Sequence, residues 1–188
     1  GNIIFANGGL GIDLSPDGVT LNDTGDGDNG SNNLQNYPVL SSATINGSLT
    51  TIQGTLDGGP STTYRLDFYV NGICDPSGYG EGSTYLGAKT VTTDASGEAS
   101  FTAAFLNFVP VGTCVTATAT DPDGNTSEFS HCLALVSIGK PHIIVRPLVL
   151  KVTLLSGDTG GGTAARALDA TLASSDTVTR TLTISNTG

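Results

Sequence analysis

Methionine and tryptophan are absent from this sequence of 188 residues, and charged residues make up only 13% of it. The seven Lys and Arg residues are outnumbered by seventeen Asp and Glu residues, which gives a formal net charge of −10. A nucleic-acid-binding protein needs a basic face for the phosphates, so this composition argues against that class of function. No run of 18 consecutive apolar residues occurs, and we therefore expect no membrane-spanning helix.

Sequence patterns typical of enzymes are also missing. The chain has two histidines, His131 and His142. His131 adjoins Cys132, and neighbouring residues on a strand point to opposite faces, so this pair cannot form a catalytic dyad. No nucleophile-elbow, zinc-protease or phosphate-loop pattern is present. We expect no catalytic site and no organic cofactor.

Helical periodicity is nearly absent, and residues 165–172 form the one short candidate. Thr, Ser and Val are abundant instead, together with 26 Gly. Branched side chains suit a pleated sheet, and glycine suits tight turns. The sequence therefore predicts an all-β fold with almost no helix.

Residues 37–135 contain short alternating runs that are separated by turn-forming residues. In TYRLDFYV, for example, the alternation places Leu66 and Phe68 inward and Asp67 and Tyr69 outward. The runs are LTTIQGTL, TYRLDFYV, STYLGAKTVTT, ASFTAAF, CVTATATD and NTSEFSHCLAL. About seven short strands at this spacing predict an immunoglobulin-like β-sandwich.

The two ends of the chain differ from this central domain. Residues 1–36 begin with GNIIFANGGLGIDL, which has the pattern of one coil of a stacked β-solenoid, and continue into an acidic Gly/Asp/Asn junction. Residues 136–188 carry an apolar run broken by Pro147 and then the alternating TVTRTLTISN, which predicts further strands from a partial second β domain or from inter-subunit pairing. Because the pattern starts in mid-structure, we expect a longer precursor.

Several segments together resemble a known architecture. They are, in order, GNIIFANGGLGIDL, DGVTLND, LQNYPVL, CDPSGYGEGSTYLG and ATATDPDGNTSEFS. Over roughly residues 1–134 the chain resembles the C-terminal region of large secreted bacterial proteins, in which a right-handed parallel β-helix precedes an immunoglobulin-like domain. The resemblance implies a β-helix end, then a sandwich, and a secreted or cell-surface location. It implies no activity, because fold alone does not determine function.

The three cysteines allow more than one pairing. A turn of even length at DPDG places Cys114 opposite His131, whereas a turn of odd length places it opposite Cys132. The segments that carry the resemblance have a cysteine at the positions of Cys74 and Cys132, so the resemblance implies that these two form a disulfide and that Cys114 is a buried free thiol. Closing that loop would stabilise the fold by roughly 3–5 kcal/mol.

The stretch NDTGDGDNGSNN, residues 22–33, has two interpretations. Calcium prefers six to eight oxygen ligands on a pliable loop, but an EF-hand register would put Asn33 where a bidentate Glu is required. An irregular calcium site and a solvated connector remain, and the mutual repulsion of uncompensated carboxylates favours the cation. The candidate calcium ligands are Asp13, Asp17, Asn22, Asp23, Asp26 and Asp28. The second acidic stretch, DPDGN, is interpreted as a hairpin turn.

We therefore expect a non-enzymatic structural or adhesive module of a secreted or cell-surface protein. Its incomplete ends could add strands to other copies of the chain, or to neighbouring domains, and so build an extracellular filament. The alternative is a carbohydrate-binding module for a surface glycan. That alternative would use exposed aromatic rings, and the candidates are Tyr79 and Tyr85, with Tyr69 and Phe108 also available.

Overall fold

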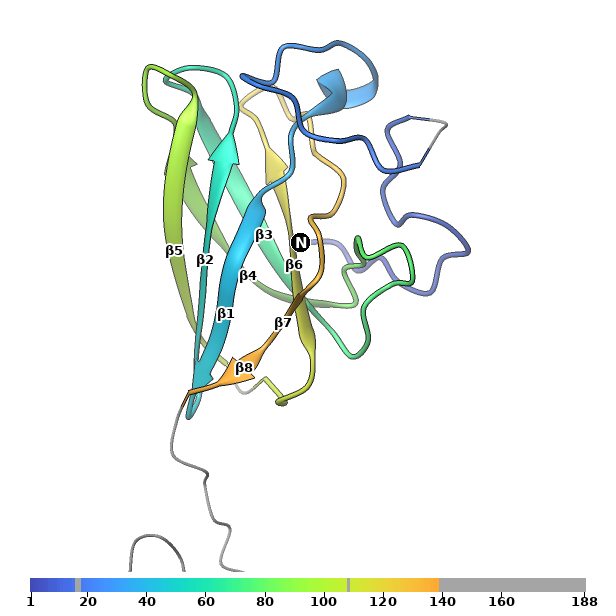
Figure 1. The fold of residues 1–188 in the computed structure, drawn as a ribbon, viewed down its shortest axis with the longest axis vertical. Coiled ribbons are helices and arrows are strands. Elements are labelled where there is room, and N and C mark those ends of the chain that lie inside the picture. Colours follow the sequence, from blue (N-terminus) through green and yellow to red (C-terminus); the bar gives the residue numbers. More distant parts are fainter. Residues whose placement is uncertain (16–17, 108, 139–188) are drawn as a thin grey trace, which may run out of the picture. The chain divides into compact units, whose positions relative to one another are not determined.

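Two four-stranded β-sheets enclose the core in the computed structural model, which describes residues 1–15, 18–107 and 109–138 (Figure 1). The strand order is β5-β2-β1-β8 in the first sheet and β4-β3-β6-β7 in the second. The elements are η1 (Ser31–Leu34), β1 (Val39–Asn46), β2 (Leu49–Asp57), β3 (Thr63–Asn71), β4 (Thr84–Thr92), β5 (Glu98–Leu106), β6 (Cys114–Thr120), β7 (Leu133–Ala134) and β8 (Val136–Ser137). The predicted all-β sandwich is confirmed, and the 3-10 turn η1 is the sole helical element in the described ranges.

The core lies between the two sheets and follows the predicted alternation. Ile52 and Leu56 of β2 face Leu66 and Phe68 of β3, and all four side chains are fully buried. Burial of such side chains contributes about 1.5–3 kcal/mol each. The apolar period of two in these strands therefore supplies the main stabilisation of the fold.

The outer face of the second sheet is also covered. Asp67 and Tyr69 lie on the side of β3 away from the core, as predicted, yet they are only 9% and 6% exposed. The ring of Tyr69 contacts the rings of Tyr85 and Phe129 edge-on, with centroids 5.7 and 5.4 Å apart. Alternation shows which face a residue belongs to, but it cannot show that another segment packs on that face.

The N-terminal segment is irregular. No β-strand occurs in residues 1–15 or 18–36, and the one bridge there joins Ile4 to Gly82 through backbone hydrogen bonds of 2.9 and 2.8 Å. Figure 1 draws this segment in blue beside the sandwich. Its assignment to the end of a β-helix stays a prediction.

The strand predicted over residues 125–135 is wrong for most of its length. Beyond a single bridge next to the turn, no strand forms before β7. The hydroxyls of Ser127 and Ser130 instead accept hydrogen bonds of 3.0 Å each from backbone N–H groups of β6. These side chains replace backbone carbonyls, so the segment stays attached to β6 without strand geometry.

This irregular segment also changes the register. The even-length turn, which placed Cys114 opposite His131, is wrong because Thr120 bridges Thr126 across the turn. The odd register holds next to the turn only, since Cys114 pairs with Ala134 further along. Residues that bulge out between the two points account for the difference, and no counting rule along the sequence predicts them.

The chain changes sheets at Leu135, which is buried. β7 pairs with β6, and β8 then runs parallel to the end of β1 in the other sheet, where Val136 pairs with Thr44. The last described residue, Ile138, donates its backbone N–H to Ile45 at 3.0 Å. The remaining predicted C-terminal strands and the short helical candidate lie outside the described residues.

Candidate functional site

Three of the predicted calcium ligands lie together. Carboxylate oxygens of Asp23, Asp26 and Asp28 all fall within 4.8 Å of one another. They belong to the loop that precedes β1, where no Lys or Arg occurs in the sequence. This carboxylate cluster is the one group of acidic side chains with metal-site spacing in the part of the chain that the structure describes.

Polar contacts fix the shape of the loop. Asn36, which is buried, accepts a 3.0 Å hydrogen bond from the backbone N–H of Asp23 and donates to its carbonyl at 2.8 Å. The backbone N–H of Asn36 donates to Asp26 at 2.7 Å. Asp57, at the end of β2, accepts a hydrogen bond from the N–H of Gly25 at 2.9 Å. The sandwich itself therefore holds the cluster in place.

The charges in the cluster are poorly compensated. Burial raises the pKa of Asp26, although its hydrogen bond from Asn36 works against this, and the nearby Asp23 and Asp28 carboxylates raise it further. Burial and the Asp23 carboxylate likewise raise the pKa of Asp28. One Oδ1 atom of Asp23 and one of Asp28 are buried without any hydrogen-bond partner. Such orphaned oxygens are costly unless a cation or water binds them.

The other predicted ligands are elsewhere. The side chain of Asn22 is used by Tyr37, with its amide donating to the Tyr37 carbonyl at 2.8 Å and its oxygen accepting from the Tyr37 N–H at 3.0 Å. Asp13 is exposed and does not belong to the carboxylate cluster. Asp17 lies outside the described residues.

Two acidic turns serve as local structure. Asp121 accepts hydrogen bonds of 2.8 Å from the backbone N–H groups of Asp123 and Asn125, which closes the DPDGN turn. Asp94 binds Ser96 and Glu98 in the same manner. The interpretation of DPDGN as a turn is confirmed.

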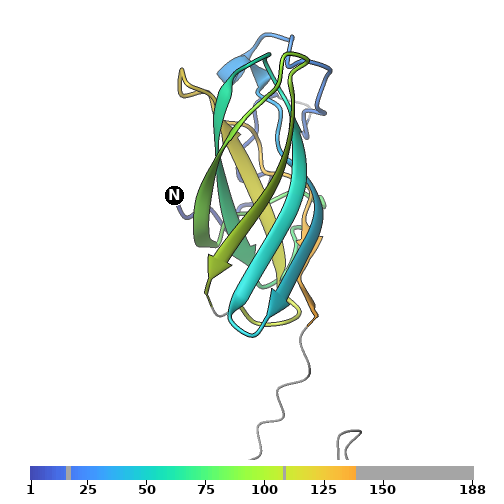
Figure 2. The same cartoon turned by 90° about the vertical axis from the view of Figure 1, so that its left-hand side faces the viewer.

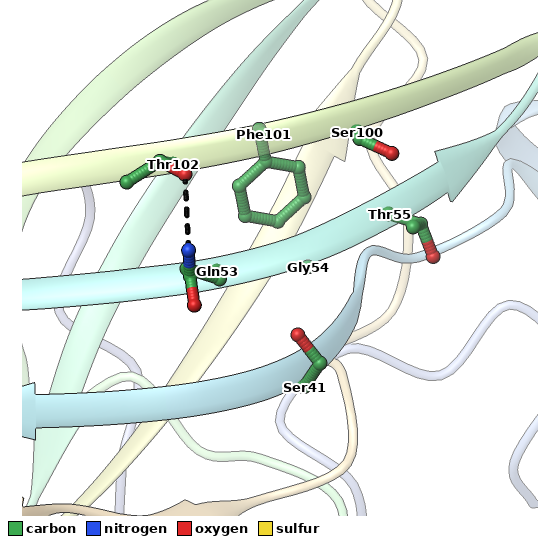
Figure 3. A pocket seen from close by; sticks show the side chains of 7 residues that line it. All are labelled: Ser41, Gln53, Gly54, Thr55, Ser100, Phe101 and Thr102. Carbon is green, nitrogen blue, oxygen red and sulfur yellow. Dashed lines mark hydrogen bonds between the residues drawn. The ribbon is translucent and has the colours of Figure 1, made fainter.

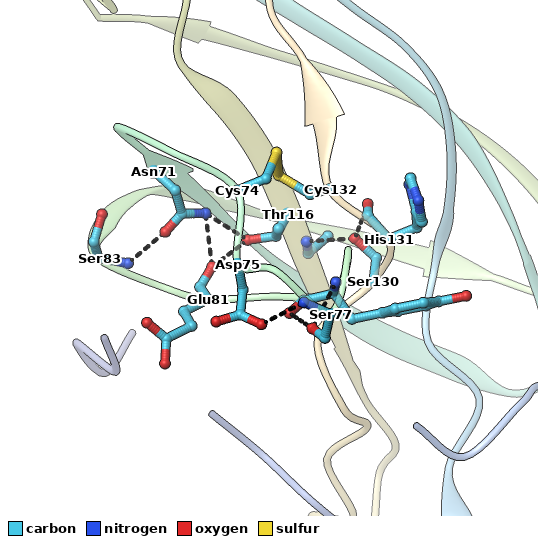
Figure 4. The surroundings of a disulfide bond; sticks show 12 residues. Asn71, Cys74, Asp75, Ser77, Glu81, Ser83, Thr116, Ser130, His131 and Cys132 are labelled. Carbon is cyan, nitrogen blue, oxygen red and sulfur yellow. Dashed lines mark hydrogen bonds between the residues drawn. A yellow bond between two sulfur atoms is a disulfide. The ribbon is translucent and has the colours of Figure 1, made fainter. Parts of the chain in front are cut away.

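The cysteines meet under the loop that follows β3 (Figure 4). The sulfur atoms of Cys74 and Cys132 lie 2.06 Å apart, at disulfide distance, and this is the pair implied by the resemblance. Cys114 is a buried free thiol within 4.8 Å of both sulfurs, and burial raises its pKa. Asn71 holds the loop above them, donating to the Glu81 carbonyl at 2.7 Å and accepting from Ser83 N–H at 2.9 Å.

The two tyrosines proposed for glycan binding are separate and partly buried. Tyr79 packs edge-on between Tyr37 and His131, with centroid distances of 5.6 and 5.3 Å. Tyr85 packs against Tyr69, and its hydroxyl donates to Asp67 at 2.9 Å. Both rings are used in packing within the molecule. Phe108 and His142 lie outside the described residues.

Two glutamates that the sequence analysis did not single out bind the N-terminal segment. Glu128 is 2% exposed and accepts three hydrogen bonds, from Leu14 N–H at 2.9 Å, Thr20 N–H at 2.9 Å and the Thr20 hydroxyl at 3.0 Å. Glu81 accepts hydrogen bonds from Ala6 at 2.6 Å and from Asn7 at 3.1 and 2.8 Å. No sequence signal distinguishes either from a surface glutamate. We call these two residues the glutamate clasps.

A shallow hollow of about 350 Å³ lies on the outer face of the first sheet (Figure 3). Hydroxyl and amide side chains line it, and Gln53 reaches Thr102 across it at 3.4 Å. The ring of Phe101 belongs to the buried core. The lining residues are Ser41, Gln53, Gly54, Thr55, Ser100, Phe101 and Thr102.

No known family model matches the chain. Across the described residues, no helix is long and apolar enough to span a bilayer.

Proposed function

We propose that this chain is a non-enzymatic structural or adhesive module of a secreted or cell-surface bacterial protein. The observation that supports this most directly is the pair of glutamate clasps. They commit Glu81 and Glu128 to holding the N-terminal segment against the sandwich. A stalk that transmits force between successive segments needs such a rigid junction, because a flexible linker would let the segments move independently.

The immunoglobulin-like assignment and the extracellular location belong to the same proposal. The order β5-β2-β1 opposite β4-β3-β6-β7 agrees with the arrangement of immunoglobulin-like sandwiches. The sulfur pair at disulfide distance supports an oxidising compartment, where such bonds persist. The resemblance to secreted β-helix proteins points the same way.

Labelling of intact producing cells tests the location. Antibodies against the sandwich, or a protease added outside, should reach the chain on intact cells or in the culture fluid. Alkylation before reduction should label Cys114 only, and only after unfolding. A reduced chain found solely in the cytosol would contradict the proposal.

We further propose that the carboxylate cluster binds calcium and stiffens the loop before β1. Three carboxylates within 4.8 Å and two orphaned buried oxygens support this, since calcium takes oxygen ligands from a pliable loop. The competing interpretation is a solvated connector.

Calorimetry with and without calcium distinguishes the two interpretations. Millimolar calcium should raise the melting temperature of the chelator-treated chain, and Asp26→Asn should abolish most of that rise. Asp13→Asn is the matched control, because Asp13 lies outside the cluster, and it should respond like the wild type. A wild-type chain indifferent to calcium would support the solvated connector.

The same variant has a pH signature in the absence of calcium. Because the folded pKa of Asp26 is raised above 3.8, its contribution to stability is present at low pH and is lost as the pH rises through the folded pKa. Asp26→Asn should therefore be more stable than the wild type at pH 7, and the difference should vanish below about pH 4. A difference independent of pH would contradict the assigned cause.

Carbohydrate binding is the second candidate, and the hydroxyl-lined hollow is the observation that favours it. Glycan-array binding that is lost in Tyr79→Ala would support the tyrosine site. Loss in Thr55→Lys instead would assign binding to the hollow. Absence of binding by the wild type would remove this candidate.

A further inference from the structure

Most edge strands of the sandwich carry features that discourage pairing with another chain. β4 has a bulge, since Phe68 pairs with Gly87 and Tyr69 with Tyr85, and it also carries Lys89. β7 and β8 each have two residues. Bulges, lysines and short length are the usual protections of natural edge strands.

The fourth edge strand, β5, lacks all of these protections. It pairs with β2 over nine consecutive residues, from Glu98 to Leu106, without a bulge. It contains neither proline nor lysine, and its edge is turned toward the viewer in Figure 2. Among the described strands it is the one long, regular edge.

The direction of the unpaired backbone groups of β5 follows from one hydrogen bond. Gly58 N–H donates to the Gly97 carbonyl at 2.9 Å, so Gly97 faces β2. Backbone groups alternate sides along an antiparallel strand. Phe101 and Ala103 therefore bond to β2, whereas the N–H and C=O groups of Ser100, Thr102 and Ala104 point away from it.

We propose that β5 pairs antiparallel with β5 of a second copy of this chain, about a two-fold axis at Thr102. In this register Thr102 faces Thr102, and Ser100 of each copy faces Ala104 of the other. The residues that meet are those with free backbone groups, so about six new hydrogen bonds can form. The inference rests on the self-association included in the proposed function and identifies the surface that performs it.

The distribution of charge supports a second copy as the occupant. The chain carries a net charge of −10, so most of its surfaces would repel one another. Glu98 is the single charge on β5, and this register places it opposite Leu106 instead of a second carboxylate. Threonine pairs across strands are favourable, whereas like charges directly opposite are not.

Exposed apolar side chains continue the same surface. Leu106 is 80% exposed and lies beside Leu49 of β2, which is 40% exposed. Two-fold pairing brings these leucines to both ends of the joined strands. The first sheet would then continue across the axis as one eight-stranded sheet, with each core unchanged.

Sedimentation velocity of the full chain over roughly 10–500 µM tests the pairing. Thr102→Pro removes an N–H that points away from β2, so it sacrifices no bond within the sheet. The wild type should dimerise with rising concentration, and this variant should remain monomeric with a similar melting temperature. Thr102→Val, which keeps the backbone donor, and Thr55→Lys, which adds charge one strand away, should both dimerise.

Hydrogen exchange resolved by residue provides a second measurement. The N–H groups of Thr102 and Ala104 should become protected only as the concentration rises, whereas Phe101 and Ala103 should be protected throughout. Protection of Thr102 in the monomer would mean that the chain's own residues cover β5, and would overturn the proposal. A wild type that stays monomeric would also overturn it.

A third outcome separates the two proposals. If Thr102→Pro dimerises like the wild type, the edge pairing is wrong while self-association stands. Surface labelling of producing cells tests the structural role independently of either result.

Discussion

At the scale of single residues, Gly54 shows how packing selects an amino acid. It lies inward on β2 opposite Phe101 of β5. A Cβ atom at Gly54 would meet the Val39 carbonyl oxygen and lie 2.7 Å from the Phe101 ring. The ring thus occupies the space of the missing side chain and covers the glycine. Sequence alternation places Gly54 inward but does not reveal this contact.

Gly54→Ala should therefore destabilise the fold by about 1–3 kcal/mol, because the backbone of β1 or the Phe101 ring must move. The free energy of unfolding in urea measures the effect. Thr55→Ala, one residue along and exposed, is the control and should change stability by less than about 0.5 kcal/mol. Equal midpoints for the two variants would contradict the packing argument.

At the scale of elements, the N-terminal segment is held by polar groups on the outer face of the second sheet. Glu128 binds it at Leu14 and Thr20, and Glu81 binds it at Ala6 and Asn7. Thr116 and Thr118 of β6, which alternation assigns to solvent, are buried. The segment and the sheet therefore behave as one layer.

Glu128→Gln should loosen that layer. The amide can satisfy the acceptors' role at only one of its two ends, so a buried donor loses its partner at a cost of about 1–3 kcal/mol. Limited proteolysis should cut residues 1–36 faster while the sandwich stays intact. The matched variant Glu98→Gln changes an exposed carboxylate and should leave the cleavage rate unchanged. Equal rates for both variants would show that the clasp contributes little.

At the scale of the whole molecule, the Cys74–Cys132 pair ties distant parts of the chain together. It joins the loop after β3 to the residues before β7, across a sequence separation of 58. Both strands belong to the second sheet, on either side of β6. The link therefore restricts the unfolded chain while adding to contacts that the sheet already makes.

The variant carrying both Cys74→Ser and Cys132→Ser should lose about 4 kcal/mol of unfolding free energy, as expected for closing a loop of this length. Urea denaturation of the oxidised proteins measures the loss. Cys114→Ala keeps the bonded pair and should lose less. Equal losses in the two variants would mean that the bond contributes through local packing alone.

The sequence by itself determined the fold class, five of the long strands and their buried faces. It also located the acidic loop, because carboxylates close in sequence can meet without any fold. Alternation and turn residues act over a few positions, so they can be read locally. The cysteine pairing followed from resemblance, since turn counting left it open.

Only the tertiary structure decided the rest. The burial of Tyr69, the glutamate clasps and the shift that pairs Cys114 with Ala134 depend on segments distant in the chain. Local patterns carry no information about which side chain replaces a backbone partner, as Ser127 does, or about which edge strand stays uncovered. Long-range packing alone determines these features.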